Sequence, residues 1–597
     1  MKKRCILSFT TSGHGVGGAL CIDGQIVAAN TLERLTRKKY DILLPISKAD
    51  LATFGWNGNP EIYPRSMDLP FDLDGDYSSV NFEDLPAFQR LLDHLLSTAG
   101  IELKDVDCVS YSYRHNESAE RFFRSRNPRA DFVVPEHHFA HACQAYLASP
   151  FEDAAIMVVD GQGVPLERTF QDQLSGCLAH GRGNSVEVLR DLPVRYSLGG
   201  MYSNFTRKCG FKTNEECKTM GLASYGTDEL YRTLKKGLRF EIREFHPGEW
   251  RRMLREGSLT REYLYSLGHY NLLLRKFKRK DPKEPFSDTY INIAYAGQKF
   301  VEDVMIYLAN WLHRKTGSKN LCISGGVGLN CVANYQVLAH SPFENIFVYP
   351  NAGDNGVAVG QALYVHHMID GHPRDYVAKH DYLGKPYMAE EIRRAVDAFR
   401  GRAGLEVEEF PDLPALYGKM AAAIADGRIT SWWQGRSEFG PRALGNRSIL
   451  ADPRNRDMKD ILNARVKFRE AFRPFTPSVL KERASEYFTL DVESPFMLLA
   501  PYVKPGKAEV VPAITHVDNT ARVQTVERSV NERYYDLIKA FEKLTGIPIL
   551  LNTSFNVAGE PIVETPEDAV RCFLSTDIDI LGIDRFMMTK TKKHSGS

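Results

Sequence analysis

Three times before residue 335, the chain runs from an apolar, strand-like stretch directly into a glycine turn. Helical stretches separate these units, and one of them is marked by apolar residues at helical spacing from Val301 to Leu312. The three units read CILSF with the hairpin GALCIDGQIVAANTLER, then AAIMVVDGQG, then NLCISGGVGLNCVAN. One glycine turn alone more often marks chain reversal than ligand binding, but three together favour an α/β fold with nucleotide-type loops. Gly325 and Gly326, in the third unit, are candidate ligand-binding positions.

The bulk composition limits the partners. The 597 residues, 43% apolar and 25% charged, predict a soluble globular protein of two or more domains. The 76 basic and 75 acidic residues give a formal charge of +1, which predicts no attraction to nucleic acid or anionic membranes. The ten cysteines show no zinc or redox spacing, and no apolar run has spanning length. We therefore expect a cytoplasmic enzyme that binds small ligands, with a homodimer left open.

The main domain boundary is expected in HHMIDGHPRDYVAKHDYLGK, residues 366–385, where apolar periodicity is lost. The predicted domains are 1–370 and 371–597. The second contains an Arg- and Gly-rich segment at 429–490, the motif LNTSFN, and a helix at PEDAVRCF that we expect Thr565 to cap, with Pro566 at its first position.

Histidines cluster in the stretch PEHHFAHACQAY, residues 135–146. On a helix, His137 and His141 share one face, and His138 points elsewhere. Asp160 and Asp354 follow at glycine-containing turns, and a set of two imidazoles and two carboxylates suits Fe(II), Zn(II) or Mn(II) with coordination positions left open. On these residues alone, ordinary packed or hydrogen-bonded histidines are an equally good interpretation.

Basic residues crowd the segment 435–478. So many guanidinium groups beside tight turns indicate a bound anion such as a carboxylate, a phosphate or an acyl phosphate. Interleaved acidic residues and a low aromatic content argue against nucleic acid, whereas surface ion pairs stay an alternative. The basic residues are Arg436, Arg442, Arg447, Arg454, Arg465, Lys467, Arg469 and Arg473.

His14 stands between two glycines, where an imidazole can approach a substrate hydroxyl and take its proton. Lys38 and Lys39 follow on the chain, and either could neutralise the oxygen of a transferred phosphoryl or carbamoyl group. Adjacent lysines are more often solvated.

Several motifs resemble, as a set, the O-carbamoyltransferases of nodulation-factor, cephamycin and aminoglycoside biosynthesis, over nearly the whole chain. The motifs are HHFAHA with VVDGQG, KTMGLASYG, SGGVGLN, NAGDNG, GPRALGNRSILADPR, VKFREAFRPFTPS, and LNTSFN with EPIV. The resemblance implies a first domain similar to the universal tRNA threonylcarbamoyl transferase, with a duplicated actin and Hsp70-type (ribonuclease H-like) fold. It implies a second α/β domain similar to threonylcarbamoyl-adenylate synthase.

The chemistry that the resemblance implies has two steps. Carbamoyl phosphate and ATP, with Mg, give carbamoyl adenylate and pyrophosphate in the second domain. The first domain then passes the carbamoyl group to a hydroxyl of a small-molecule acceptor and releases AMP. Activation has a physical reason, because a carbamoyl carbon is a poor electrophile until it bears a good leaving group.

The resemblance also assigns residues. It implies an iron-type site at His137, His141, Asp160 and Asp354, a general base at His14 and a lysine that touches carbamoyl adenylate at Lys39. Carbamoyl phosphate would be held by Arg442, Lys467, Arg473 and Asn552, and the ATP site lined by Met497, Arg522 and Ser554. The segment 41–85 is interpreted as an aromatic- and proline-rich insertion beyond what the family needs, and it is expected to shape acceptor choice.

Three alternatives stay open. A hydrogenase-maturation carbamoyltransferase would need an acylphosphatase module and paired CxxC motifs, which this sequence lacks. A tRNA threonylcarbamoylation enzyme has no support from the near-neutral charge. An actin-like or Hsp70-like ATP-binding regulator would have no use for the histidine pair. The sequence does not name the acceptor.

Overall fold

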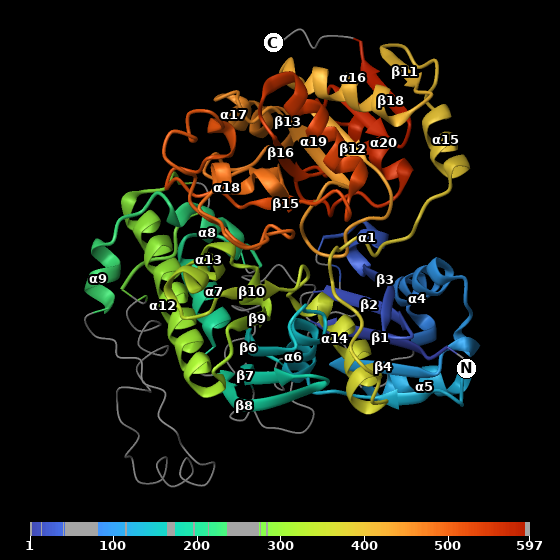
Figure 1. Cartoon of the computed structure of the whole chain (residues 1–597), viewed down its shortest axis with the longest axis vertical. Helices are drawn as coiled ribbons and strands as arrows, with labels where there is room; N and C mark the ends of the chain where they lie inside the picture. The colour runs from blue at the N-terminus through green and yellow to red at the C-terminus, as the bar shows by residue number, and fades with distance from the viewer. Residues whose placement is uncertain are drawn as a thin grey trace.

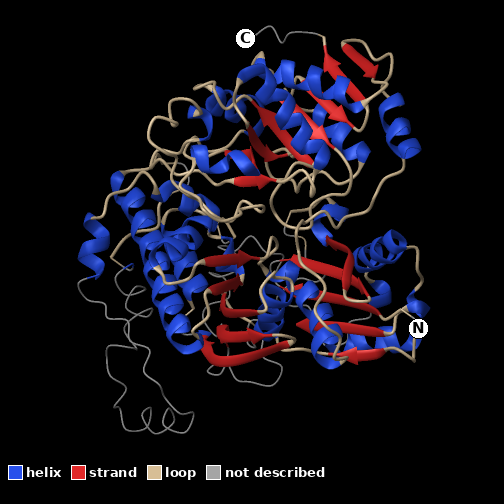
Figure 2. Ribbon diagram, in the orientation of Figure 1, coloured by secondary structure: helices blue, strands red, loops and turns tan. Residues whose placement is uncertain are grey.

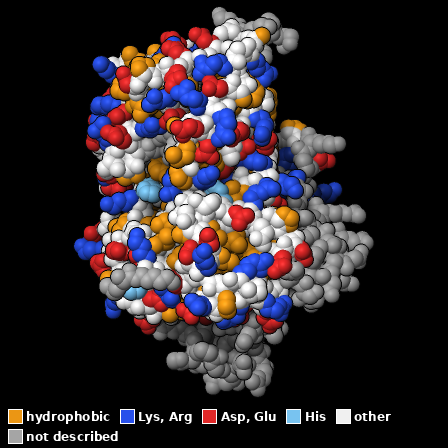
Figure 3. All heavy atoms as spheres, turned by 90° about the vertical axis from the view of Figure 1, so that its right-hand side faces the viewer, with side chains coloured by type: hydrophobic (Ala, Val, Ile, Leu, Met, Phe, Trp, Pro, Cys, Tyr) orange, Lys and Arg blue, Asp and Glu red, His pale blue; other side chains and the backbone are white. Residues whose placement is uncertain are grey.

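The computed structural model describes residues 3–12, 15–39, 41, 82–113, 116–163, 174–194, 197–212, 214–235, 274, 276–281 and 284–591. These residues form two lobes: two five-stranded sheets lie in the lower lobe of Figure 1 and an eight-stranded sheet in the upper one. Basic and acidic side chains are interspersed on the face shown in Figure 3. None of the described helices is both long and apolar enough to cross a membrane.

The first sheet has the strand order β3-β2-β1-β4-β5. β2 runs antiparallel to its neighbours β1 and β3, whereas β4 and β5 continue the direction of β1. The predicted hairpin is confirmed: Asp23 and Gly24 connect β2 to β3 with φ of 48° and 80°, as a two-residue turn of this kind requires. The strands are β1 (Cys5–Ser12), β2 (Gly15–Ile22), β3 (Gln25–Thr31), β4 (Cys108–Tyr113) and β5 (Asp131–Val133).

The second sheet repeats this plan, with the order β10-β9-β6-β7-β8. β7 is antiparallel to β6 and β8, and β9 and β10 are parallel to β6. Counted from its first strand, each sheet therefore reads 3-2-1-4-5, the ribonuclease H-like plan that actin and Hsp70 duplicate. The predicted α/β class with a duplicated first domain is confirmed. The strands are β6 (Asp153–Val159), β7 (Leu174–Arg182), β8 (Ser185–Pro193), β9 (Asn320–Ser324) and β10 (Asn345–Val348).

Helices cover both sheets, as Figure 2 shows. Two of them, α6 and α14, lie between the sheets, and α12 packs on the second sheet. The helix predicted around Val301 is α12. The helices of this lobe are α1 (Leu32–Thr36), α4 (Pro86–Ala99), α5 (Asn116–Arg126), α6 (His137–Leu147), α7 (Leu198–Lys208), α8 (Glu216–Ala223), α9 (Glu229–Lys235), α12 (Asp288–Thr316), α13 (Cys331–His340) and α14 (Val357–Leu363), which continues as the π-helical turn η7 (Tyr364–Ile369).

The stretch 349–404 contributes no strand to a sheet, and the predicted boundary near residue 370 falls in it. The third sheet follows, with the order β11-β18-β17-β12-β13-β16-β14-β15. Its strands are β11 (Leu405–Glu409), β12 (Thr430–Trp433), β13 (Arg447–Ala451), β14 (Thr476–Leu480), β15 (Gln524–Val526), β16 (Ile549–Ser554), β17 (Ile580–Ile583) and β18 (Phe586–Lys590).

The helices around the third sheet include the one predicted at PEDAVRCF. Thr565 caps it as expected: its hydroxyl accepts a hydrogen bond from the Asp568 amide at 3.0 Å, and Pro566 is the first helical residue. These helices are α15 (Ala389–Asp397), α16 (Leu413–Ala425), α17 (Met458–Leu462), the π-helical turn η8 (Asn463–Lys467), α18 (Ala484–Tyr487), α19 (Glu532–Thr545) and α20 (Pro566–Leu574).

Glycine allows α14 to approach α6 closely. A Cβ on Gly360 would lie 2.0 Å from the Ala140 carbonyl oxygen and 2.8 Å from the backbone nitrogen of Gln144, both on α6. Backbone atoms cannot move aside as the end of a side chain can. The distance between the two helices is therefore set by the missing side chain.

We predict that Gly360→Ala destabilises the first lobe by roughly 1 to 3 kcal/mol or more, as overpacking in a core does. Gly418→Ala on α16 is the matched control, because this exposed helical position has open space around it. There, alanine should stabilise the helix by about 0.5–1 kcal/mol. Thermal unfolding midpoints of the two variants should move in opposite directions, and an unchanged midpoint for Gly360→Ala would contradict the packing argument.

Candidate functional site

Two histidines and two aspartates meet between α6, the end of β6 and the 3-10 turn η6 (Asp354–Gly356), which leads into α14. One ligand atom from each of His137, His141, Asp160 and Asp354 lies within 4.8 Å of the others. The Nε2 atom of His137 is 3.5 Å from Asp160 Oδ2, and that of His141 is 3.6 Å from Asp354 Oδ1. The helix predicted for the histidine pair is confirmed, and the four residues proposed as ligands are together.

A buried hydrogen-bond chain fixes the orientation of His141. The amide of Gln144 donates to the Asn351 carbonyl at 2.9 Å, which leaves its Oε1 to accept from the Ser324 hydroxyl at 2.6 Å. Having given its only proton to Gln144, Ser324 must accept from His141 Nδ1, which lies 2.9 Å away. The proton of the neutral ring is therefore on Nδ1, and the lone pair of Nε2 faces the two aspartates.

The charges in this cluster suit a cation. Burial lowers the pKa of His141, so its ring is neutral. Burial also acts to lower the pKa of His137, but hydrogen bonding to Asp160 and the charge of Asp354 outweigh it and raise the value to about 9. Asp160 is further held by the Gly326 amide, which donates to its Oδ1 at 2.9 Å.

These residues fit a divalent transition metal ion. The Nε2 atom of His141 is buried and has no hydrogen-bond partner within the described ranges, although it is surrounded by acceptors. Two imidazole nitrogens and two carboxylate oxygens are the donor set expected for Fe(II), Zn(II) or Mn(II). His138 lies beside them, with Nε2 at 3.9 Å from Asp160 Oδ2 and Nδ1 at 3.4 Å from Glu136 Oε1.

A cluster of cations forms the second candidate site, in the upper lobe. Burial lowers the pKa of Lys467 well below its ordinary value, and the charges of Arg469, Arg473 and Lys39 lower it further. Burial likewise lowers the pKa of Arg469 and of Arg522 to about 9, and neighbouring guanidinium groups, including Arg442 beside Arg522, add to the effect. These side chains are thus close enough to repel one another.

The protein supplies little negative charge to this cluster. The cluster consists of Arg442, Lys467, Arg469, Arg473 and Arg522. Among the described residues, the one ion pair that these five cations make is the 3.9 Å contact between Arg473 and Glu470. The buried Nε atoms of Arg442 and Arg522 have no hydrogen-bond partner in the described part of the chain. Lys467 is buried, and the guanidinium groups around it are half-buried. Cations taken out of water without anionic partners are costly, so the arrangement is that of an anion-binding site.

Neutral groups complete the cluster. Lys467 Nζ donates to Asn556 Oδ1 at 2.8 Å and contacts Ser554 Oγ at 3.4 Å. Asn552 Nδ2 donates to the carbonyl of Ala443, next to Arg442, at 3.1 Å. Met497 is buried and has a left-handed backbone, with φ of 57°, just before the segment that pairs Leu499 with Val523. The residues proposed for carbamoyl phosphate and ATP therefore converge on one region.

The sequence prediction missed residues on both sides of this region. Arg469 belongs to the cluster and was visible in the arginine-rich segment, but spacing alone did not separate it from its neighbours. From the first lobe, α8 contributes Lys218, which pairs with Glu470 at 2.8 Å, and Cys217, whose Sγ is 3.9 Å from Arg473. The motif KTMGLASYG was the available signal for α8.

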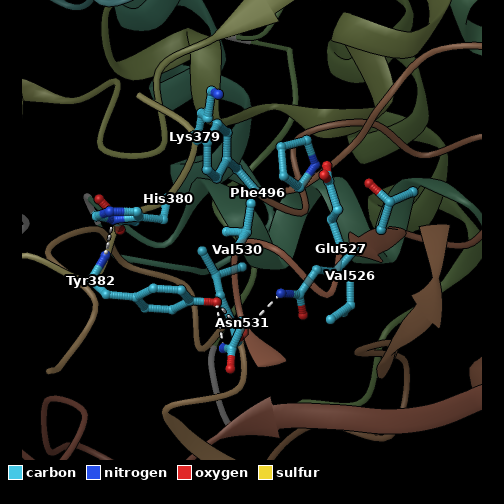
Figure 4. Close-up of a pocket in the computed structure, with 13 residues that line it drawn as sticks. Lys379, His380, Tyr382, Phe496, Val526, Glu527, Val530 and Asn531 are labelled. Atoms are coloured by element: carbon cyan, nitrogen blue, oxygen red, sulfur yellow. Dashed lines mark hydrogen bonds between the residues drawn. The ribbon is translucent and has the colours of Figure 1, made fainter. Parts of the chain in front are cut away.

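The cavity in Figure 4 lies elsewhere. Residues 379–382 of the connection between the lobes and residues 524–527, 530 and 531 of the upper lobe form much of its wall, and its volume is about 20 Å³. Tyr382 and Asn531 meet across it through a hydrogen bond of 2.8 Å. A cavity of that volume holds about one water molecule and is too small for a nucleotide.

His14 lies outside the described residues, as does most of the segment 41–85. Their proposed roles as general base and as a determinant of acceptor choice therefore stay predictions. Lys39 is described and exposed, and its charge acts on Lys467.

Known proteins match both sites. Residues 110–363 match the family described as Carbamoyltransferase N-terminus, and residues 421–590 match Carbamoyltransferase C-terminus. The nodulation protein NolNO of Sinorhizobium fredii is 34% identical over 97% of this chain and 79% of its own length. NolO of Bradyrhizobium diazoefficiens is 38% identical over 76% of this chain and 78% of its own length. The uncharacterized protein sll1178 of Synechocystis is 36% identical over 98% of this chain and 97% of its own length. The first match contains the His and Asp cluster, and the second contains the cations of 442–522.

The orientation of His141 can be tested through metal affinity. Ser324→Ala removes the acceptor that holds the ring proton on Nδ1, and loss of such an outer partner typically weakens metal binding about 10- to 100-fold. Ser431→Ala, which removes a buried hydroxyl bonded to the Ile580 carbonyl in the other lobe, should leave affinity unchanged. Competition with a chromophoric chelator measures both. Equal affinities for Ser324→Ala and the parent protein would rule out this role.

The cation cluster makes a prediction about stability. Arg522→Met replaces a half-buried guanidinium, whose Nε has no hydrogen-bond partner among the described residues, with an apolar side chain. We therefore expect the ligand-free protein to gain on the order of 1 kcal/mol. The same variant should lose the rise in unfolding temperature that pyrophosphate gives the parent. Arg393→Met removes an exposed arginine paired with Glu409 and should keep that response. A full pyrophosphate response in Arg522→Met would remove this arginine from the anion site.

Proposed function

Because the chain belongs to the carbamoyltransferase family, with both the N-terminal and the C-terminal domain present, we propose that it is an ATP-dependent O-carbamoyltransferase. Its upper lobe converts carbamoyl phosphate and ATP into carbamoyl adenylate and pyrophosphate. Its lower lobe passes the carbamoyl group to a hydroxyl of a small natural-product acceptor and releases AMP. The observation that carries the first step is the cluster of cations around Lys467, in which the described residues pair only Arg473 with a carboxylate, that of Glu470.

Counting phosphorus atoms shows that the first step has a further product. Carbamoyl phosphate and ATP hold four, whereas carbamoyl adenylate and pyrophosphate hold three, so inorganic phosphate is also released. Water cleaves the P–O bond of carbamoyl phosphate, and an oxygen of the resulting carbamate attacks the α-phosphorus of ATP. Arg442, Lys467, Arg473 and Asn552 hold carbamoyl phosphate, and Met497, Arg522 and Ser554 line the ATP site, with Mg bound to the nucleotide. Guanidinium and ammonium groups fixed in a buried site stabilise charge on the transferred groups without reorganising.

The second step belongs to the lower lobe. His137, His141, Asp160 and Asp354 would hold a divalent ion, Fe(II) in the first instance, and Zn(II) or Mn(II) are compatible with the same donors. When bound, the ion supplies Lewis-acid charge for polarising the carbamoyl carbonyl. His14 takes the proton of the acceptor hydroxyl, and Lys39 stabilises the adenylate whose C–O bond to AMP breaks. The amide of Gly326 holds Asp160 in place for this ligand set.

The two half-reactions should separate by mutation. Lys467→Met removes one charge-assisted contact, worth roughly 1.5–3 kcal/mol, so pyrophosphate release dependent on carbamoyl phosphate should fall at least tenfold. His141→Ala should keep this release, because its ring lies in the other cluster, and should lose transfer to the acceptor. Lys419→Met, which breaks an exposed pair with Glu408, is the matched control for lost charge and should behave as the parent.

Pyrophosphate, phosphate and AMP are measured separately, and mass spectrometry follows carbamate addition to candidate hydroxylated metabolites. The two-site proposal fails if Lys467→Met makes pyrophosphate at the parent rate. It also fails if folded His141→Ala loses pyrophosphate release as completely as it loses transfer.

A further inference from the structure

A second group of metal-binding side chains lies at the far end of the helix that follows Asp354. α14 continues into the π-helical turn η7, and His366, Asp370 and His372 then come together. One ligand atom of each lies within 4.8 Å of the others. In the sequence, this stretch showed only the loss of periodicity that marks the domain boundary.

The backbone builds this arrangement. The Asp370 amide donates to the Val365 carbonyl at 2.9 Å, the five-residue spacing of a π-turn, and the His372 amide donates to the His366 carbonyl at 3.2 Å. Between them, Gly371 has φ of 74°, which lets the chain reverse at low cost. His372 is thereby folded back over His366, and the two rings stack with their centroids 4.5 Å apart and their planes 23° apart.

The three side chains differ in exposure: His366 is buried, Asp370 is half-buried and His372 is exposed. His366 is 5% exposed, and its Nδ1 is buried without a hydrogen-bond partner in the described ranges. The ring is seated against the β2–β3 turn, since a Cβ on Gly24 would lie 2.7 Å from its Nε2. A buried ring nitrogen without a partner carries a cost that a bound cation would remove.

Arg4 orients the carboxylate of this group. Its Nε and Nη2 donate to the two oxygens of Asp370 at 2.9 and 3.1 Å. A carboxylate has about four lone-pair positions, so it can accept both bonds and still bind an ion. Ligating carboxylates are commonly held by such outer hydrogen bonds.

We propose that His366, Asp370 and His372 form a zinc site distinct from the cluster around His141. Two imidazoles and one carboxylate, with a fourth position open to solvent, are a donor set that Zn²⁺ accepts. The ion fastens the start of the connection to the second lobe onto the helix whose other end carries Asp354. The proposal is independent of the carbamoyltransferase mechanism.

Zinc binding tests this directly. Full-length protein stripped with a chelator is titrated with Zn²⁺ alone, and bound metal is counted after gel filtration. We expect two equivalents in the parent and one in His372→Gln, whose exposed side chain can change without disturbing the core. His340→Gln changes another exposed histidine and should keep two. The His137→Ala, His141→Ala protein should bind one equivalent of Zn²⁺. Adding His366→Ala and His372→Gln to that protein should leave no bound Zn²⁺.

Zn²⁺ should also raise the unfolding temperature of the His137→Ala, His141→Ala protein, and His372→Gln should abolish this shift. The zinc site is rejected if His372→Gln binds as many equivalents as His340→Gln. It is also rejected if the protein without His137 and His141 binds no Zn²⁺.

Discussion

The approach of α14 to α6 is the constraint on which the lower lobe depends. Each helix belongs to one of the two duplicated halves, and each brings part of the proposed metal site. α6 carries His137 and His141, and the turn before α14 carries Asp354. A Cβ on Gly356 would lie 1.9 Å from the Asn351 carbonyl oxygen, so the turn and the helix both require a missing side chain. The ligand set therefore exists because two halves of one fold pack at backbone distance.

The upper lobe shows two ways to bury an arginine. Arg447 is fully buried, but its guanidinium donates to backbone carbonyls that include Gln434 and Gly435, and it lies 4.0 Å over the Trp433 ring. Its guanidinium makes four hydrogen bonds to backbone carbonyls, so it stabilises the fold. Arg522 lies near Arg442 and Arg473, and its buried Nε has no hydrogen-bond partner among the described residues. This contrast distinguishes a structural arginine from an arginine that binds a ligand, because a bound anion would supply the hydrogen-bond acceptors and the negative charge.

The same contrast explains which features of the fold and the sites could be predicted from the sequence. Local signals were sufficient for the Asp23-Gly24 hairpin and the Thr565 cap, because turn and cap chemistry act within a few residues. They also placed His137 and His141 on one helix face. They could not sort the arginines of 435–478: Arg454 pairs with Asp452, Arg465 pairs with Asp579, and Arg469 faces the cluster. The partner of Arg454 is two positions away, whereas the partner of Arg465 is more than a hundred positions away, so nearby sequence does not show which charges are neutralised. The protonated nitrogen of His141 depends likewise on Ser324.

Residues of both lobes determine the charge of the cation cluster. Lys218 on α8 binds Glu470, the one carboxylate paired with Arg473 in the described part of the chain. At 2.8 Å, this contact is shorter than the 3.9 Å contact between Glu470 and Arg473. Lys218 thus draws negative charge away from Arg473 and leaves that guanidinium available to an anion. Lys39 adds its charge to Lys467 from the same lobe. The lobe that would receive the carbamoyl group therefore helps set the charge of the site that would activate it.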